Sequence, residues 1–129
     1  MKNFLFALFL SVAFTASAAD KKTGHQRVGV DAFHKLWKEK KLAVIDVRTP
    51  GEFSEGHIPG AKNIDYRSRD FKKKIGKLDK SKEYLVHCRS GGRSAAASKI
   101  MVGMGFKLVY DLADGMMGWE EEGKPVSQK

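Results

Sequence analysis

The segment from Cys88 to Arg93 reads Cys-Arg-Ser-Gly-Gly-Arg and lies between an apolar run and a run of helix-forming residues. It combines one nucleophile with two cations and two glycines. The thiolate is the reactive form of cysteine, and nearby positive charge lowers the pKa of a thiol. Gly91 and Gly92 permit positive φ values and the close approach of backbone N–H groups to the sulfur. The segment therefore predicts an activated cysteine.

The energy needed to activate Cys88 shows which groups must contribute. Lowering the pKa of a thiol from about 8.5 to about 6.5 requires roughly 2.7 kcal/mol. A helix dipole supplies only about 0.3–1 kcal/mol, whereas hydrogen bonds to a charged group contribute about 1.5–3 kcal/mol each. We therefore expect two or three N–H groups of the loop to point at the sulfur. Arg89 and Arg93 add positive charge and can also hold an anionic substrate.

Strand and helix patterns alternate along the chain around this segment. Short apolar runs predict strands over residues 42–47, 62–64, 83–87 and 107–110. Helical patterns cover residues 31–40, where Asp31 is the expected N-cap, and residues 51–55, 67–75, 94–104 and 116–122. This alternation predicts an α/β fold with a mainly parallel sheet. Ligands bind at the carboxyl ends of the strands in such sheets, and Cys88 falls at such an end.

The chain has 129 residues, a formal net charge of +9 and one cysteine. This length suits one domain with a single core, and a lone cysteine cannot form an internal disulfide. Residues 1–19 have a basic start, an apolar run over 4–14 and small residues at 16–19, the pattern of a secretory signal peptide. An uncleaved membrane anchor is the alternative, although a span needs about 20 apolar residues.

Cleavage near Ala18 or Ala19 predicts an exported protein, located in the periplasm of a bacterium and without stable membrane insertion. Residues 20–25 are expected to form a flexible leader, residues 26–126 the domain and residues 127–129 a tail. We expect no cofactor.

Basic residues are concentrated between Lys62 and Lys82, where nine of them stand against three acids. Such a stretch can attract small anions, an anionic membrane surface or nucleic acid, or it can simply be a solvated helix face. Few aromatic residues lie nearby for base stacking, so no nucleic-acid partner is expected. The solvated face is the simplest interpretation.

Three ordered stretches identify a resemblance. The segment Cys88 to Arg93 resembles the active-site loop of single-domain rhodaneses, which are sulfurtransferases. Residues 46–61 (DVRTPGEFSEGHIPGA) and 112–119 (LADGMMGW) are similar to the amino-terminal and carboxy-terminal signatures of that family. One departure is visible, because Asp114 stands where the family usually has the first of two glycines.

The resemblance implies a central parallel sheet of about five strands, flanked by helices on both faces. It also implies a two-step reaction, in which Cys88 takes a sulfur atom from an anionic donor such as thiosulfate. The persulfide so formed then passes that sulfur to cyanide or to a thiol. The resemblance assigns the N–H groups of the loop to the persulfide anion, and Arg93 with Arg89 to the sulfonate end of the donor. The implied binding residues are Arg89, Ser90, Gly91, Gly92, Arg93 and Ser94.

Charged residues near the first signature are interpreted as support for the loop. Asp46, Arg48 and Glu52 lie at a strand end and the following turn, where charges usually pair, so we expect an ion-pair network. His57 is expected to be a hydrogen-bonded structural histidine. The histidines and Cys88 lack the spacing of metal ligands, so no metal site is predicted.

Two alternatives to sulfur transfer remain open. A cysteine phosphatase or arsenate reductase of the related fold would place five residues between cysteine and arginine, whereas four separate Cys88 from Arg93 here. The shorter loop should close too tightly for a tetrahedral phosphate while still seating one extra sulfur atom. The other alternative is a non-catalytic rhodanese-like binding module, which would not need the nucleophile, both arginines and the glycine pair.

Overall fold

A computed structural model describes residues 23–129, so the predicted signal peptide and residues 20–22 lie outside the described residues. The strands are β1 (Gly24–Val28), β2 (Ala43–Asp46), β3 (Lys62–Asn63), β4 (Glu83–His87) and β5 (Leu108–Leu112). The helices are α1 (Val30–Glu39), α2 (Pro50–Glu55), α3 (Phe71–Ile75), α4 (Gly92–Gly103) and α5 (Gly115–Glu121).

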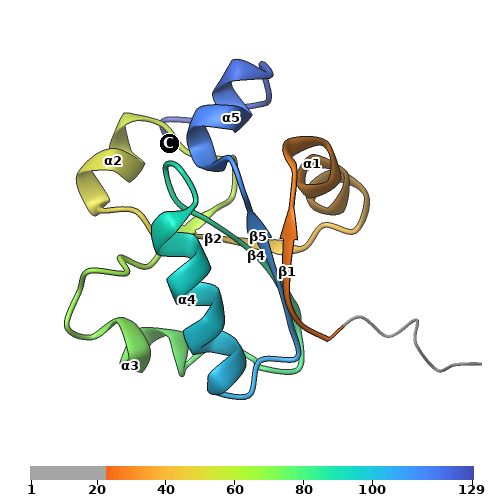
Figure 1. The fold of residues 1–129 in the computed structure, drawn as a ribbon. Coiled ribbons are helices and arrows are strands. Elements are labelled where there is room, and N and C mark those ends of the chain that lie inside the picture. Colours follow the sequence, from red (N-terminus) through yellow and green to blue (C-terminus); the bar gives the residue numbers. More distant parts are fainter. Residues whose placement is uncertain (1–22) are drawn as a thin grey trace, which may run out of the picture.

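The five strands form one parallel sheet in the order β1-β5-β4-β2-β3. β4 lies at its centre, because the run Tyr84–Val86 is apolar and buried. All carboxyl ends meet at one edge of a parallel sheet, and Cys88 follows the last residue of β4 at that edge (Figure 1). The predicted α/β fold with a five-stranded parallel sheet is confirmed.

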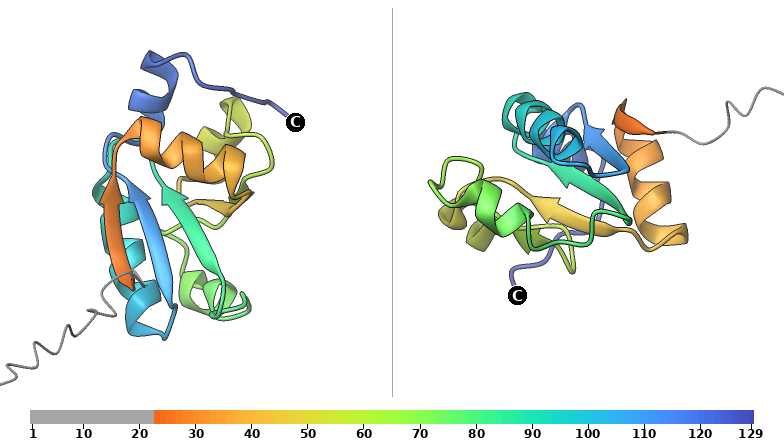
Figure 2. Two further views of the ribbon diagram at one scale, coloured as in Figure 1. Left: turned by 90° about the vertical axis from the view of Figure 1, so that its right-hand side faces the viewer. Right: turned by 90° about the horizontal axis from the view of Figure 1, so that it is seen from below.

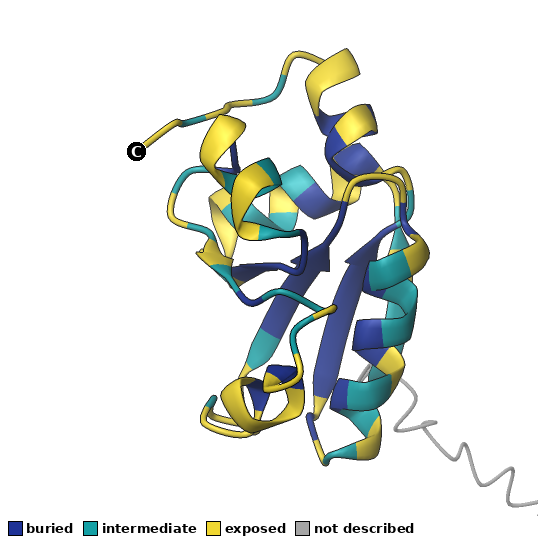
Figure 3. Cartoon of the chain, turned by 90° about the vertical axis from the view of Figure 1, so that its left-hand side faces the viewer, coloured by how far each residue is buried: buried dark blue, intermediate teal, exposed yellow. Residues whose placement is uncertain are grey.

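Helices cover both faces of the sheet, as predicted (Figure 2). α3 and α4 pack on one face, where their buried residues are Phe71, Ile75, Ala97 and Met101. α1 and α5 pack on the other face, where their buried residues are Val30, Phe33, Met116 and Trp119. The inner strands β2, β4 and β5 are largely buried between these layers, and exposed positions gather on the outward sides of the helices (Figure 3). Within residues 23–129 no helix combines the length and apolar character needed to cross a bilayer.

Local side-chain bonds set where the helices begin. At α2, Thr49 and Glu52 form a reciprocal capping box ahead of Pro50. α1 begins at Val30 after Gly29, so the predicted N-cap Asp31 lies instead in the first turn, where its charge suits the helix dipole.

α3 is shorter than the predicted helix over residues 67–75. It begins only at Phe71. Asp65 accepts a bond from the N–H of Arg67, and the Ser68 hydroxyl donates to Asp70. Such local bonds favour turns over helix.

β1 was not predicted. It pairs with β5, so that His25 lies beside Val109 and Arg27 beside Asp111. Residues 24 and 25 therefore belong to the sheet rather than to a leader. The predicted tail is also attached to the domain, because the backbone of Ser127 exchanges two hydrogen bonds with that of His57, both of 2.8 Å.

Candidate active site

Cys88 is enclosed by the loop that leads into α4. The N–H of Gly91 donates to Sγ at 3.1 Å, and the Ser94 hydroxyl lies 3.4 Å from Sγ. The residue is only 1% exposed. The loop therefore places the Gly91 N–H and the Ser94 hydroxyl against a sulfur atom that bulk water scarcely reaches.

Two opposing effects act on the thiol of Cys88. Burial by itself raises the pKa, because it disfavours the charged sulfur. The Ser94 hydroxyl and the N–H groups of Ser94, Gly91 and Ser90 act in the other direction, and together they outweigh burial. The pKa of Cys88 is consequently below its ordinary value, as the sequence predicted for an activated cysteine.

Gly91 is required by its backbone. Its φ is +103°, and a Cβ there would lie 2.3 Å from the carbonyl oxygen of Ala113. Only glycine fits this close approach without displacement. The same residue supplies the N–H that donates to Sγ. The activation of the Cys88 thiol therefore depends on having glycine at position 91.

α5 holds the Cys88 loop from the other side. The N–H groups of Met116 and Met117 donate to the carbonyls of Cys88 and Arg89 at 2.8 and 3.1 Å, as free donors of a first helical turn can. Gly115 lies directly against the loop, since its φ is +60° and a Cβ would fall 2.2 Å from the carbonyl oxygen of Arg89. Asp114 has φ −90°, which any residue adopts. Its departure from the family pattern therefore leaves the turn intact.

The structure contains the predicted ion-pair network as two separate pairs. Glu52 binds Arg93 through two hydrogen bonds, of 2.7 and 3.0 Å. The hydrogen bond from Arg93 is the main cause that lowers the pKa of Glu52 to about 2. Arg93 thus joins α2 to the first turn of α4 and commits both terminal nitrogens to Glu52. Its predicted contact with a sulfonate stays a prediction.

The Glu52–Arg93 pair predicts an acid-dependent loss of stability. A carboxylate whose pKa is about 2 in the folded protein and about 4.3 when unfolded stabilises the fold above pH 4.3, and this contribution disappears as the pH falls to 2. In urea unfolding at pH 7, the free energy of unfolding of wild type should exceed that of Glu52→Gln by about 1 kcal/mol. This value suits an ion pair that is still partly exposed to solvent. The difference should shrink towards zero at pH 2–3. The exposed Glu55→Gln is the control, and an equal difference at pH 7 and pH 3 would contradict the pairing.

Asp46 and Arg48 form the second pair, which is buried. Arg48 donates to the Asp46 carboxylate from its backbone N–H, Nε and Nη2, at 2.8–3.1 Å. Nη2 also donates to the carbonyl of Gly56 at 2.7 Å. Nε2 of the buried His87 lies 3.5 Å from the same carboxylate. The pair therefore fixes the end of β2 beside the residue that precedes Cys88.

His57 supports the neighbouring segment rather than the Cys88 loop. Its ring stacks on Phe53 with centroids 3.9 Å apart, and Nδ1 lies 3.0 Å from the Phe53 carbonyl oxygen. His57 is 3% exposed. Its role is structural, and it holds the end of α2 against the carboxy-terminal segment.

A pocket of about 240 Å³ opens between α2, the Cys88 loop and α5. Its lining residues are Arg48, Glu52, Glu55, Gly56, Arg89, Met116, Met117 and Glu120. Arg48 and Glu52 are engaged in the pairs described above. Among residues 23–129, Arg89 forms no ion pair within 4.0 Å. Arg89 is therefore the guanidinium of this pocket that is free to meet an anion.

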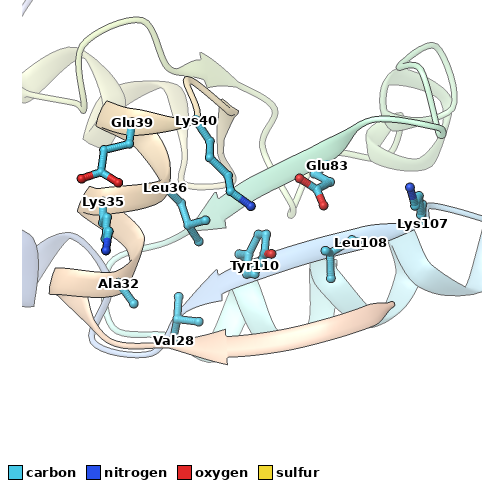
Figure 4. Close-up of a pocket in the computed structure, with 10 residues that line it drawn as sticks. All are labelled: Val28, Ala32, Lys35, Leu36, Glu39, Lys40, Glu83, Lys107, Leu108 and Tyr110. Carbon is cyan, nitrogen blue, oxygen red and sulfur yellow. The ribbon is translucent and has the colours of Figure 1, made fainter. Parts of the chain in front are cut away.

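A larger pocket, of about 480 Å³, lies elsewhere (Figure 4). It is a groove between α1 and the sheet, with Leu36, Leu108 and Tyr110 among its apolar walls and Lys35 and Lys40 at its rim. No residue of the Cys88 loop lines it. Within residues 23–129 no group of three or more potential metal ligands gathers.

Sequence reasoning missed the contribution of β1 to the site. Arg27 donates to the carbonyl of Gly91 and lies beside the buried Asp111, to which His25 is also paired. Asp111 was the available signal, because a carboxylate inside the apolar run 108–112 must find a partner. The Ser94 hydroxyl near Sγ was also not anticipated, although the residue itself was.

A buried cysteine with a lowered pKa lies at the carboxyl end of a central parallel strand, and a short loop leads from it into a helix. This arrangement defines an α/β protein with a candidate cysteine nucleophile. The family model described as Rhodanese-like domain matches residues 29–122. The chain belongs to this family.

Similar proteins cover most of the domain. YtwF of Bacillus subtilis (strain 168) is 45% identical over 91 residues, which are 70% of this chain and 85% of that protein. Thiosulfate sulfurtransferase GlpE of Pseudomonas putida strain F1 is 35% identical over 95 residues, covering 73% of this chain and 84% of that protein. The crystal structure of a rhodanese-related protein from Thermoplasma volcanium has a TM-score of 0.72 and 31% identity, and covers 81% of this chain and 99% of that chain.

Proposed function

We propose that the protein is a sulfurtransferase that carries a sulfane sulfur on Cys88. The observation that carries the proposal is the seating of Sγ, with the Gly91 N–H at 3.1 Å and the Ser94 hydroxyl at 3.4 Å. These groups favour a thiolate, and the same groups can stabilise a persulfide anion. Related proteins named as sulfurtransferases support this function.

The reaction proceeds in two displacements. The Cys88 thiolate attacks the outer sulfur of thiosulfate, the S–S bond of the donor breaks, and its electron pair leaves with sulfite. The enzyme then carries a terminal sulfur bonded to Sγ. An acceptor anion, cyanide or a thiolate, attacks this terminal sulfur, and the electron pair of the broken bond returns to Sγ. The contacts that lower the pKa of Cys88 favour its ionised form, and an ionised Cys88 requires no general base.

Arg89 is the residue we assign to the anionic end of the donor. It lines the pocket next to Cys88 and is exposed, whereas Arg93 is held by Glu52. The assignment narrows the sequence prediction, which gave this task to both arginines.

Phosphatase chemistry is the alternative that an activity assay must separate from sulfur transfer. We expect purified protein to release sulfite from thiosulfate in the presence of cyanide and to leave p-nitrophenyl phosphate intact. The engagement of Arg93 by Glu52 supports this expectation, because a phosphatase needs its loop arginine free for phosphate. Hydrolysis of the phosphate ester without sulfite release would overturn the proposal.

The three adjacent lysines of α3, Lys72, Lys73 and Lys74, should contribute little to donor capture. α3 lies beside the end of the sheet where β4 begins, whereas Cys88 follows the other end of β4 (Figure 1). The five residues of β4 separate the two ends by about 16 Å, while the Debye length is about 8 Å at physiological ionic strength. Replacing Lys72, Lys73 and Lys74 together by glutamine should change kcat/KM for thiosulfate by less than about twofold at that ionic strength.

Arg89→Gln is the matched comparison for the triple lysine variant. It should lower kcat/KM by about tenfold, the loss expected for one charge-assisted contact. A large loss in the lysine variant, together with a small loss in Arg89→Gln, would show that donor capture depends on the distant segment instead.

We also propose that the protein is exported and that residues 1–19 are removed. The basic start and apolar run support this proposal. The amino-terminal sequence of protein recovered from fractionated bacterial cells should begin at Ala19 or Asp20. Recovery of chains that still begin at Met1, in the membrane fraction, would contradict cleavage and favour an anchor.

A further inference from the structure

β1 brings His25 and Arg27 to the back of the Cys88 loop, where they lie next to Asp111 of β5. Its residues alternate, so Gln26 and Val28 face the α1 side of the sheet while His25 and Arg27 face the α4 side, next to Asp111 of β5. Asp111 is fully buried. A buried carboxylate is stable only with a counter-charge, and β1 supplies it.

The contacts around Asp111 fix the direction of Arg27. Nε2 of His25 lies 3.0 Å from Oδ2 of Asp111, and Nε of Arg27 lies 3.5 Å from the same oxygen. The guanidinium is planar, so anchoring its Nε edge directs its far nitrogens. Nη2 is thereby aimed at the loop that contains Cys88.

Nη2 of Arg27 donates to the carbonyl of Gly91 at 2.8 Å. The same carbonyl accepts the N–H of Ala95 at 3.2 Å and the Ser94 hydroxyl at 3.3 Å. Three donors therefore hold one peptide group of the loop, and Arg27 makes the shortest of these contacts. Nη2 also lies 3.5 Å from the carbonyl oxygen of Ala113, on the segment that leads into α5.

Gly91 transmits this hold to the sulfur. The carbonyl that Arg27 binds and the N–H that reaches Sγ at 3.1 Å belong to the same residue, whose φ of +103° sets their relative direction. A Cβ on Gly91 would lie 2.4 Å from Nη2 of Arg27, so the two residues are in direct packing contact. If Arg27 is displaced, the Gly91 carbonyl loses its shortest contact, and rotation about the backbone bonds of Gly91 can turn its N–H away from Cys88.

We infer that Arg27 is a positioning residue for the Cys88 thiolate, and that Asp111 and His25 hold Arg27 in place. It keeps the Gly91 N–H directed at Sγ and thereby stabilises the charged form of the sulfur. This assignment extends the proposed function, since it states how the nucleophile of that reaction is maintained. It also gives β1, which is outside the three rhodanese-like motifs, a part in the site.

The test measures the thiol directly. Cys88 is the only cysteine of the chain, so the rate of alkylation by iodoacetamide reports on this residue alone. Rates measured from pH 5 to pH 10 on purified protein give the apparent pKa of Cys88. Arg27→Ala should raise this pKa by about one unit, the effect of weakening a hydrogen bond to the charged form, and should slow alkylation at pH 7 several-fold.

Arg27→Lys separates positioning from charge. Lysine keeps the positive charge, but it lacks the planar guanidinium that contacts both Asp111 and the Gly91 carbonyl. The pKa of Cys88 in Arg27→Lys should therefore equal that in Arg27→Ala. Lys107→Ala removes an exposed cation just before β5, at the opposite end of the sheet from the loop, and the pKa of Cys88 in this variant should equal that of wild type. A wild-type profile in Arg27→Lys would overturn the inference, because charge alone would then suffice.

Arg27→Ala leaves the buried Asp111 without its arginine partner and could unfold for that reason, so a second variant is needed. Arg27→Ala combined with Asp111→Asn removes the buried charge together with its partner, and it too should raise the pKa of Cys88. An unchanged alkylation profile in this folded double variant would refute the inference. Alkylation does not require sulfur transfer, so a protein that shows these shifts but releases no sulfite would refute the proposed function alone.

Discussion

Cys88→Ser should abolish sulfur transfer. A serine hydroxyl is not ionised near neutral pH and cannot carry a sulfane sulfur, so sulfite release with thiosulfate and cyanide should fall by roughly 10³-fold or more. Steady-state kinetics at pH 7–8 measure this loss. The substitution exchanges sulfur for oxygen in a site that is 1% exposed, and the surrounding bonds from Gly91 and Ser94 can still be made.

A control must show that Cys88→Ser remains folded. Its circular dichroism spectrum should match wild type, and its melting temperature should lie within a few degrees. A folded Cys88→Ser variant that transfers sulfur as well as wild type would contradict the account. Inactivity of both proteins would instead favour the non-catalytic binding module.

Asp46→Asn should produce the largest loss of stability. Asp46 is fully buried and accepts three donors of Arg48, which is itself 6% exposed. Removing the carboxylate charge leaves the Arg48 guanidinium buried without its partner, a change that costs about 3–5 kcal/mol. For a domain of this size the melting temperature should fall by more than about 10 °C. Thermal unfolding followed by circular dichroism measures it.

Asp70→Asn is the matched control for Asp46→Asn. Asp70 is exposed, and its carboxylate forms an ion pair with Lys74, at 3.5 Å, and accepts a hydrogen bond from the Ser68 hydroxyl. Surface pairs of this kind contribute little, so the melting temperature should move by no more than about 2 °C. Equal decreases in the melting temperature of the two variants would show that the buried Asp46–Arg48 pair stabilises the fold no more than a surface pair does.

The loop around Cys88 could be predicted from the sequence because this part of the site is local. Cys88, the following loop and the start of α4 are contiguous, so residue types and spacing alone predicted an activated thiol at a strand end. The Glu52–Arg93 contact was predicted only as part of a general network, since its two residues are 41 positions apart. Pairing over such distances depends on strand order, which periodicity does not reveal.

β1 shows where local pattern fails. Its residues Gly24–Val28 contain one aliphatic side chain, so no apolar run marks them as a strand. Pairing with β5 and the charge on the buried Asp111 draw this segment into the sheet. The start of α3 was misplaced for a related reason, because side-chain bonds of Asp65 and Ser68 form turns where residue propensity favours helix.

The most direct test of the central claim is the intact mass of the purified protein after treatment with thiosulfate and removal of excess donor. Covalent sulfur transfer predicts an increase of one sulfur atom, about 32 Da, that is absent in Cys88→Ser and is lost again when cyanide is added. An unchanged mass in wild-type protein that nevertheless turns over thiosulfate, or the same increase in Cys88→Ser, would contradict a persulfide on Cys88.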